Sequence, residues 1–193
     1  MHIDSLERDI FYSIQMNNER VQIAFDNTIE DINKLFLSKN ITFPPAGIFI
    51  RIFKQEEELE LWAQNGHGQY EFIKMYPICA LCGSLGPKRQ EGDQQIPEGF
   101  YRIERFNPVS QYHLSLGLNY PNDSDMILSN HDDPGCHIFI HGNCVTVGCI
   151  PITDIFIEEL YTIALNTFKA GQHHIPVHIF PTYLTNQRYN ALD

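Results

Sequence analysis

A histidine–glycine pair followed by a glycine–cysteine pair is the part of this sequence best suited to do chemistry. His141-Gly142 ends an apolar run, and Gly148-Cys149 closes the segment that follows it. A cysteine needs a base to form a thiolate near neutral pH, because its free pKa is about 8.5. A glycine before the nucleophile lets the backbone turn tightly and leaves its N–H free to face an oxyanion. The pattern predicts a site for acyl transfer, with Cys149 as nucleophile and His141 as general base.

The backbone between the two pairs supplies candidates for an oxyanion hole, although the same residues would also form an ordinary tight turn. The candidate backbone groups belong to Gly142, Thr146, Val147, Gly148 and Cys149. If His141 is the base, another group must hold its second ring nitrogen. The sequence does not identify that group.

The cysteines allow other interpretations of this segment. The chain has five of them, so at least one stays unpaired in a monomer, and an oxidising compartment would permit up to two disulfides. Cys149 could be a buried cysteine or could be bridged to Cys144, because free cysteine is among the most buried residue types. Cys79-x-x-Cys82 could be a redox or zinc half-site, but a strand-to-loop segment with two small apolar side chains is the simpler interpretation.

A zinc cluster is the main competing hypothesis, since zinc takes four nitrogen or sulfur ligands in a tetrahedron. The candidate ligands are Cys136, His137, His141, Cys144, Cys149, His173 and His174. In an extended strand, however, His137 and His141 would lie about 13 Å apart, too far to share one metal. A bound metal would also block the thiol, and we therefore expect no metal or other cofactor.

Composition limits the class of protein and of partner. The chain has 193 residues, 43% of them hydrophobic, which indicates one globular domain. A net charge of −11 argues against nucleic acid or an anionic membrane as partner. No run of about 18 apolar residues is present, so no transmembrane helix is expected.

The periodicity of apolar residues predicts helices at the two ends of the chain and strands between them. Residues 1–38 are expected to form helices, with a break at Asn17-Asn18. A helix capped by Thr153 or Asp154 should follow Cys149 and end at Gly171. Residues 83–99 should form a long loop. The predicted strands are Ile48 to Phe53, Leu59 to Ala63, Tyr70 to Tyr76, Phe100 to Ile103, Tyr112 to Leu118, His137 to Ile140 and His174 to Phe180.

Two details of these strands bear on the site. His137, Phe139 and His141 would share one face of an extended strand, so that His141 ends the strand at the Gly142 corner, where it could meet the cysteine. Pro176 would place the last strand at an edge of the sheet or mark a strand start.

The order of short motifs over about residues 43–185 resembles the L,D-transpeptidase catalytic domain, the YkuD-like fold, in its YafK-like branch. The motifs are, in chain order, Phe53-Lys54, Leu59-Glu60-Leu61-Trp62, Tyr76-Pro77-Ile78-Cys79, Leu85-Gly86-Pro87-Lys88, Gly92-Asp93, Ile96-Pro97-Glu98-Gly99-Phe100-Tyr101, Tyr112-His113-Leu114-Ser115, Asn119-Tyr120-Pro121-Asn122 and His141-Gly142 with Gly148-Cys149.

The sequence also departs from the main branch of that family. The main branch has a longer insertion between the two pairs and a serine two residues before the nucleophile, whereas Thr146 here lies three before Cys149. The arginine that follows the cysteine there is replaced by Ile150-Pro151-Ile152, so an arginine clamp on a substrate carboxylate is not supported at that place. Cys82 stands where the YafK-like branch tends to have serine.

The resemblance implies a β-sandwich-like catalytic domain. Together with the helical segment that the apolar periodicity predicts before it, the expected fold class is mainly β (α+β) with flanking helices. The implied organisation is a helical segment over 1–42, the catalytic domain over 43–185 and a tail over 186–193. The helical segment lies outside the resemblance, and it could pack on the domain, cap the cleft or mediate dimerisation. Residues that could line a substrate cleft are Lys88, Asp93, Tyr112, His113, Ser115 and Tyr120.

The resemblance further implies a cysteine acyltransferase that acts on peptidoglycan stem peptides at diaminopimelate through a thioester. Members of the family form bonds there or hydrolyse them, and some remove proteins attached to the wall, such as a wall-linked lipoprotein. The implied location is the periplasm. Because the first nine residues lack the basic and apolar regions of a leader, that location would require a leader removed from this chain, and the residues alone are equally compatible with the cytoplasm. A zinc-binding domain and a non-catalytic wall-binding module are the alternatives.

Overall fold

The computed structural model describes residues 4–129 and 133–185, and the predicted tail over 186–193 lies outside them. Two helices open the chain, α1 (Ser5–Met16) and α2 (Glu19–Ser38), in agreement with the predicted break. The break is built from the two asparagines: Asn17 ends α1, and the side chain of Asn18 accepts a hydrogen bond from the N–H of Arg20 at 3.0 Å. An asparagine in this place satisfies one of the free N–H groups at a helix start.

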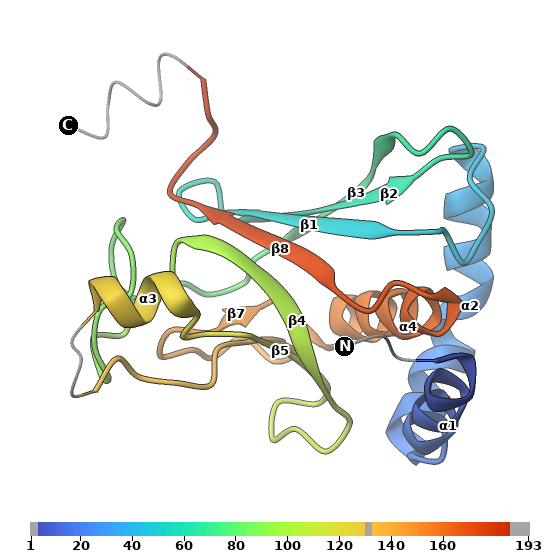
Figure 1. Cartoon of the computed structure of the whole chain (residues 1–193), viewed down its shortest axis with the longest axis horizontal. Coiled ribbons are helices and arrows are strands. Elements are labelled where there is room, and N and C mark those ends of the chain that lie inside the picture. The colour runs from blue at the N-terminus through green and yellow to red at the C-terminus, as the bar shows by residue number, and fades with distance from the viewer. Residues whose placement is uncertain (1–3, 130–132, 186–193) are drawn as a thin grey trace.

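The strands in the described ranges form one mixed sheet of eight, in the order β3-β2-β1-β8-β4-β5-β6-β7. The sheet curls, so that β1–β3 lie above β4, β5 and β7 in Figure 1, with β8 and β4 joining the two arms. The mainly β fold with flanking helices predicted from the sequence is confirmed. The strands are β1 (Ile48–Phe53), β2 (Glu58–Gln64), β3 (Tyr70–Pro77), β4 (Gly99–Asn107), β5 (Ser115–Leu118), β6 (Phe139–His141), β7 (Ile150–Pro151) and β8 (Ile175–Phe180).

Helix α4 (Asp154–Ala170) connects the site to the rest of the core. It begins five residues after Cys149, runs beneath the arm of β1 and β8, and packs against both N-terminal helices (Figure 1). The hydroxyl of Tyr161 on α4 donates to Gln15 of α1 at 2.6 Å, and both side chains are buried. The N-terminal helices therefore share the core of the strands rather than projecting from it. No helix in the described ranges is long and apolar enough to cross a membrane.

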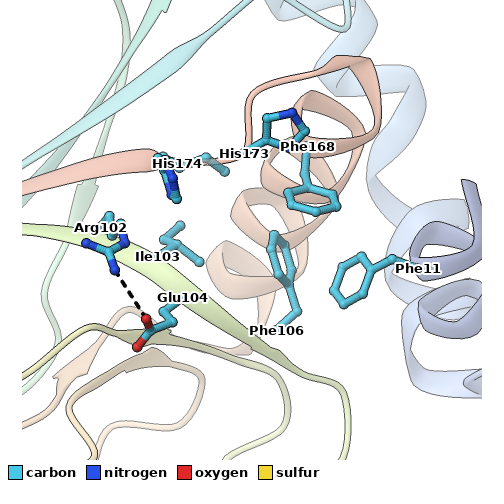
Figure 2. A pocket seen from close by; sticks show the side chains of 9 residues that line it. Phe11, Arg102, Ile103, Glu104, Phe106, Phe168, His173 and His174 are labelled. Carbon is cyan, nitrogen blue, oxygen red and sulfur yellow. Dashed lines mark hydrogen bonds and ion pairs between the residues drawn. The ribbon is translucent and has the colours of Figure 1, made fainter. Parts of the chain in front are cut away.

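Aromatic side chains fill the junction between α1 and the sheet. Phe11 lies 5.0 Å from Phe168 and 5.6 Å from Phe106, measured between ring centroids. Figure 2 shows these three rings beside a cavity of ≈ 290 Å³, whose polar rim carries Arg102 and His174. This junction fixes α1 against β4 and α4.

Several predicted boundaries differ from the structure. The strand expected from Tyr112 begins only at Ser115, because the preceding residues turn and His113 has a left-handed φ of 70°. The strand expected from His137 begins at Phe139 for the same reason, since φ of His137 is 61°. The short helix α3 (Asp123–Leu128) and the two-residue β7 were not predicted.

Pro176 lies inside the sheet, although at a strand start. β8 is flanked by β1 and β4, so the prediction of an edge strand is wrong. The pairing of β8 with β1 begins at Val177, one residue after the proline. The missing N–H of Pro176 therefore removes no hydrogen bond from that ladder, and the alternative prediction of a strand start is confirmed.

Candidate active site

A small cavity brings together the two residues predicted to do chemistry. It has a volume of ≈ 180 Å³ and lies where β4, β5 and β6 meet the segment before β7. Its lining residues are Asn107, Ser110, Gln111, Tyr112, Ser115, Phe139, His141 and Cys149. The cysteine is a free, half-buried thiol, and its Sγ lies 3.7 Å from the carbonyl oxygen of His137.

The imidazole of His141 is oriented by the backbone next to it. Its Nδ1 lies 2.5 Å from the carbonyl oxygen of Gly142, which can only accept a hydrogen bond, so Nδ1 carries the proton. In the neutral ring, Nε2 then keeps its lone pair. That atom is buried and has no hydrogen-bond partner among the described residues. The Gly142 carbonyl is therefore the group that the sequence left unidentified, and it leaves Nε2 available as a base.

The ring of Tyr112 stacks on one face of the His141 imidazole. The two rings are stacked with centroids 4.7 Å apart and planes inclined by 30°. The His141 side chain is buried, with 1% of its surface exposed. Ring stacking on one side and a hydrogen bond at Nδ1 leave the imidazole little freedom to rotate.

Burial keeps both reactive groups neutral. It lowers the pKa of His141 below its ordinary value, and the hydrogen bond to Gly142 opposes this shift. Burial also raises the pKa of the Cys149 thiol, against smaller opposing effects of the Phe139 backbone and the charge of Lys88. A charged form is costly in a site removed from water. The resting pair is therefore a thiol and a neutral imidazole.

Close packing, rather than an unusual φ, explains the glycine after His141. A Cβ at Gly142 would collide with Oδ1 of Asp154 and would lie 2.9 Å from the carbonyl oxygen of Tyr112. The same Asp154 oxygen accepts a hydrogen bond from the N–H of Asn143 at 2.8 Å. The first residue of α4 thus fixes the corner that follows the histidine. The predicted cap at Thr153 makes no side-chain hydrogen bond to the helix.

The turn before the cysteine differs from the expected oxyanion hole. The N–H of Gly148 donates to Oγ1 of Thr146 at 3.1 Å, so this N–H is not free to face an oxyanion as predicted. The Thr146 hydroxyl in turn donates to the carbonyl oxygen of Cys149 at 2.8 Å. Gly148 has a φ of +127°, which side chains rarely tolerate. The threonine therefore closes the turn. The N–H of Gly142, also predicted as an oxyanion donor, instead donates to the carbonyl oxygen of Leu114 at 3.2 Å. The amides of Thr146, Val147 and Cys149 stay candidates for an oxyanion hole.

A disulfide ties this segment to the opposite arm of the sheet. Cys79, just after β3, is bonded to Cys144, and their Cα atoms lie 5.4 Å apart. The alternative bridge between Cys144 and Cys149 is not formed, and Cys82 and Cys136 are free. Within the described ranges, no group of three or more His, Cys, Asp or Glu side chains is arranged to hold a metal ion. Of the cysteines in the hypothetical zinc cluster, Cys144 is thus held in a disulfide, whereas Cys136 and Cys149 are free thiols.

The predicted cleft residues divide into two groups. Tyr112 and Ser115 line the cavity. His113 does not, because its Nε2 lies 2.7 Å from Glu158 of α4. Lys88 is buried and forms an ion pair with Asp93 at 2.6 Å, so its amine holds the long loop together instead of facing the cavity. Likewise, the hydroxyl of Tyr120 donates to the carbonyl oxygen of Pro134.

Sequence reasoning missed three polar residues of the cavity wall, as well as Phe139 of β6. Asn107, Ser110 and Gln111 lie at the end of β4 and in the loop that follows it. The only signal for them was the turn composition of Asn107-Pro108, which indicates a loop but not a site.

The chain was compared with known families and proteins. No family model matches the sequence. Two curated relatives, both named "Putative L,D-transpeptidase YafK", come from Escherichia coli strain K12 and Escherichia coli O157:H7, and each is 36% identical over 141 residues. The match covers 72% of this chain and 56% of each relative, so the chain spans about half the length of the curated relatives it matches.

Two solved structures share the fold. The helical cell shape determining protein Pgp2 from Campylobacter jejuni matches with a TM-score of 0.56 and 22% identity, over 70% of this chain and 48% of that chain. Bd1075 from Bdellovibrio bacteriovorus matches with a TM-score of 0.50 and 23% identity, over 75% of this chain and 52% of that chain. The fold and the sequence identity agree with the motif order, and the chain belongs to the L,D-transpeptidase family, in the branch of YafK.

Proposed function

We propose that the protein is a cysteine acyltransferase of the L,D-transpeptidase type, with Cys149 as nucleophile and His141 as general base. The observation that carries this proposal is the arrangement of the imidazole. Its Nδ1 is held by the Gly142 carbonyl, its Nε2 is buried without a partner among the described residues, and the free thiol lines the same cavity. Family membership makes the stem peptide of peptidoglycan, cut at diaminopimelate, the proposed acyl donor.

The reaction begins with a proton transfer within the neutral pair. Nε2 of His141 takes the proton from the Cys149 thiol as Sγ attacks the carbonyl carbon of the scissile amide. The C–N bond then breaks, the imidazolium returns the proton to the leaving amine, and a thioester on Sγ remains. An acceptor amine, or water, attacks the thioester and loses its proton to the same histidine. The products are a new amide or a free carboxylic acid, with the thiol restored.

The size and lining of the cavity suit the reacting end of a peptide. A volume of ≈ 180 Å³ is below the range of pockets that enclose a whole drug-sized ligand, about 300–1,000 Å³. The amides of Asn107 and Gln111 and the hydroxyl groups of Ser110 and Ser115 are neutral hydrogen-bonding groups. They can pair with a peptide backbone, and the rest of the donor would lie outside the cavity.

The disulfide supports a location outside the cytoplasm. Disulfides persist in oxidising compartments and are rare in the reducing cytosol. The bridge between Cys79 and Cys144 therefore favours the periplasm, where peptidoglycan and wall-linked lipoproteins are the proposed partners.

The test is product analysis after incubation with purified muropeptides. The parent protein and the Cys149→Ala variant are compared by liquid chromatography and mass spectrometry, with Cys136→Ala as the matched control because Cys136 is also a free thiol. We expect loss of a muropeptide in the parent and the control, and none with Cys149→Ala. A joined product indicates transfer, and two fragments whose masses add up to that of the muropeptide plus one water indicate hydrolysis. Full turnover by Cys149→Ala would contradict the proposal.

A further inference from the structure

One arginine of the N-terminal helices holds the loop that forms a wall of the candidate site. Arg20 is the second residue of α2, and the loop runs from Pro108 to Leu114, between β4 and β5. Nη1 of Arg20 lies 2.9 Å from the carbonyl oxygen of Ser110 and 3.4 Å from that of Pro108, and it also donates to the carbonyl oxygen of His113. A single charged nitrogen thus contacts carbonyl groups at both ends of the loop.

The Arg20 side chain needs hydrogen-bond acceptors, and the loop carbonyl groups supply them. The guanidinium is always charged and can only donate hydrogen bonds. No ion pair of Arg20 is present in the part of the chain that the structure describes, so the carbonyl groups are its partners there. A cation in the first turn of a helix also opposes the helix dipole, so this position costs α2 a little stability. The hydrogen bonds to the loop offset that cost.

The same loop carries the side chain that stacks on the histidine. Ser110, Gln111 and Tyr112 line the cavity, and the Tyr112 ring lies 4.7 Å from the ring of His141. The N–H of Tyr112 donates to Oγ of Ser110 at 3.1 Å. Moving the carbonyl groups that Arg20 holds would therefore move the tyrosine that packs against the base.

A second contact between α2 and the loop runs through α4. Asn27 of α2 donates to Oε2 of Glu158 at 3.1 Å, and Oε1 of Glu158 lies 2.7 Å from Nε2 of His113. α1 is fixed to α4 by the hydrogen bond between Gln15 and Tyr161. α2 also packs against α4, and it buries Val21, Ala24 and Ile32, so it can support the loop.

We propose that Arg20 is a positioning residue for the reaction: by holding the 108–114 loop, it keeps Tyr112 stacked on His141 and so keeps the imidazole in place in the cavity that it shares with the Cys149 thiol. The N-terminal helices, which lie outside the region of family resemblance, are then part of the catalytic unit. The inference rests on the proposed function for its rate measurements. It can also be tested through the reactivity of the thiol alone.

The first experiment compares Arg20→Gln with the parent, with Lys34→Gln as the matched control. Lys34 lies on the same helix, and its ion pairs among the described residues are with exposed Glu30 and Asp31. With muropeptide as substrate, we expect Arg20→Gln to lower kcat on the order of 10²-fold, because a displacement of about 1 Å at a reacting group has such an effect. Lys34→Gln should keep the parent kcat. Arg20→Lys restores a charged donor one bond short of Nη1 and should recover part of the loss.

A double-mutant cycle then asks whether Arg20 acts through the tyrosine. If it does, Tyr112→Ala should lower kcat by a similar factor, and the Arg20→Gln/Tyr112→Ala variant should be no more than about threefold worse than Tyr112→Ala. The inference would be overturned if the losses of kcat in the two single variants multiplied in the double variant. It would also be overturned by an Arg20→Gln variant that is folded by circular dichroism and fully active. If Arg20→Gln does not fold, Arg20→Lys takes its place in the cycle.

The same double-mutant cycle can be measured without any muropeptide, through the rate at which Cys149 is alkylated. In a background of Cys82→Ala and Cys136→Ala, Cys149 is the free thiol that iodoacetamide can alkylate. Arg20→Gln and Tyr112→Ala should each slow alkylation at pH 7 by about tenfold or more, since both weaken the access of the base to the thiol. The double variant should be alkylated about as slowly as either single variant. If the parent turns over no muropeptide but this pattern holds, the proposed substrate fails and the positioning role stands. Unchanged alkylation in Arg20→Gln would overturn the positioning role.

Discussion

Breaking the disulfide between Cys79 and Cys144 should lower the free energy of unfolding by several kcal/mol. The bonded residues are separated by 65 positions. In the chain-entropy treatment, closing a loop of that length lowers the entropy of the unfolded chain enough to stabilise the fold by about 4 kcal/mol at 25 °C. For a protein of this size, each kcal/mol corresponds to about 2–4 °C in Tm, so a loss of about 8–16 °C is expected.

The assay is urea unfolding of a Cys79→Ser/Cys144→Ser variant, with Cys82→Ser/Cys136→Ser as the matched control of two free thiols. Serine is close in size to cysteine, so the change removes the bond with little change in packing. The parent treated with a reductant should behave like the double variant. A free energy of unfolding within about 1 kcal/mol of the parent value would refute the reasoning, because it would mean that the bridge does not constrain the unfolded chain.

Three further predictions concern the site itself. Gly142→Ala should lower the free energy of unfolding by about 1–3 kcal/mol, since the added Cβ would collide with Asp154 and approach the Tyr112 carbonyl. Urea unfolding measures this loss, and an unchanged midpoint would contradict the packing argument. Because burial raises the pKa of Cys149, the rate of its alkylation should keep rising with pH above about 8.5, the pKa of a free cysteine. Because burial lowers the pKa of His141, the ring should stay neutral down to below about pH 6.5, so kcat/KM should fall only in more acidic solution. Alkylation that is already maximal near pH 6 would show a thiolate–imidazolium pair and contradict both shifts.

Local patterns were enough to predict most of the fold. The two N-terminal helices and their break followed from apolar spacing and the paired asparagines, and the long loop over 83–99 followed from its composition. The short elements were missed for a physical reason. α3 is only six residues long, although Asn122 and Asp125 form a capping box. β7 exists because Ile150 pairs with Ile140 of β6, and no local pattern encodes a pairing of two residues.

The sequence was enough to predict the residue types of the candidate site, but not the hydrogen bonds, the disulfide or the contacts between distant elements. Residue types and spacing predicted Cys149 and His141 as partners, and the structure places both residues in the lining of one cavity. The acceptor that fixes His141 is the backbone of Gly142, and every residue has such a carbonyl, so no sequence signal distinguishes it. Cysteine spacing does not reveal connectivity, which is why the bridge from Cys79 to Cys144 was not predicted. Contacts between distant elements, such as that of Arg20 with the 108–114 loop, appear only once the chain is folded.

The most direct test of the account is a search for the acyl-enzyme. The protein is mixed with purified muropeptide, quenched in acid within seconds and examined by intact mass spectrometry and peptide mapping, beside Cys149→Ala and Cys136→Ala. We predict a mass increase equal to the acyl fragment, mapped to Cys149, in the parent and in Cys136→Ala but absent from Cys149→Ala. An adduct of the same mass on Cys149→Ala, or muropeptide turnover by that variant, would contradict the assignment of Cys149 as nucleophile.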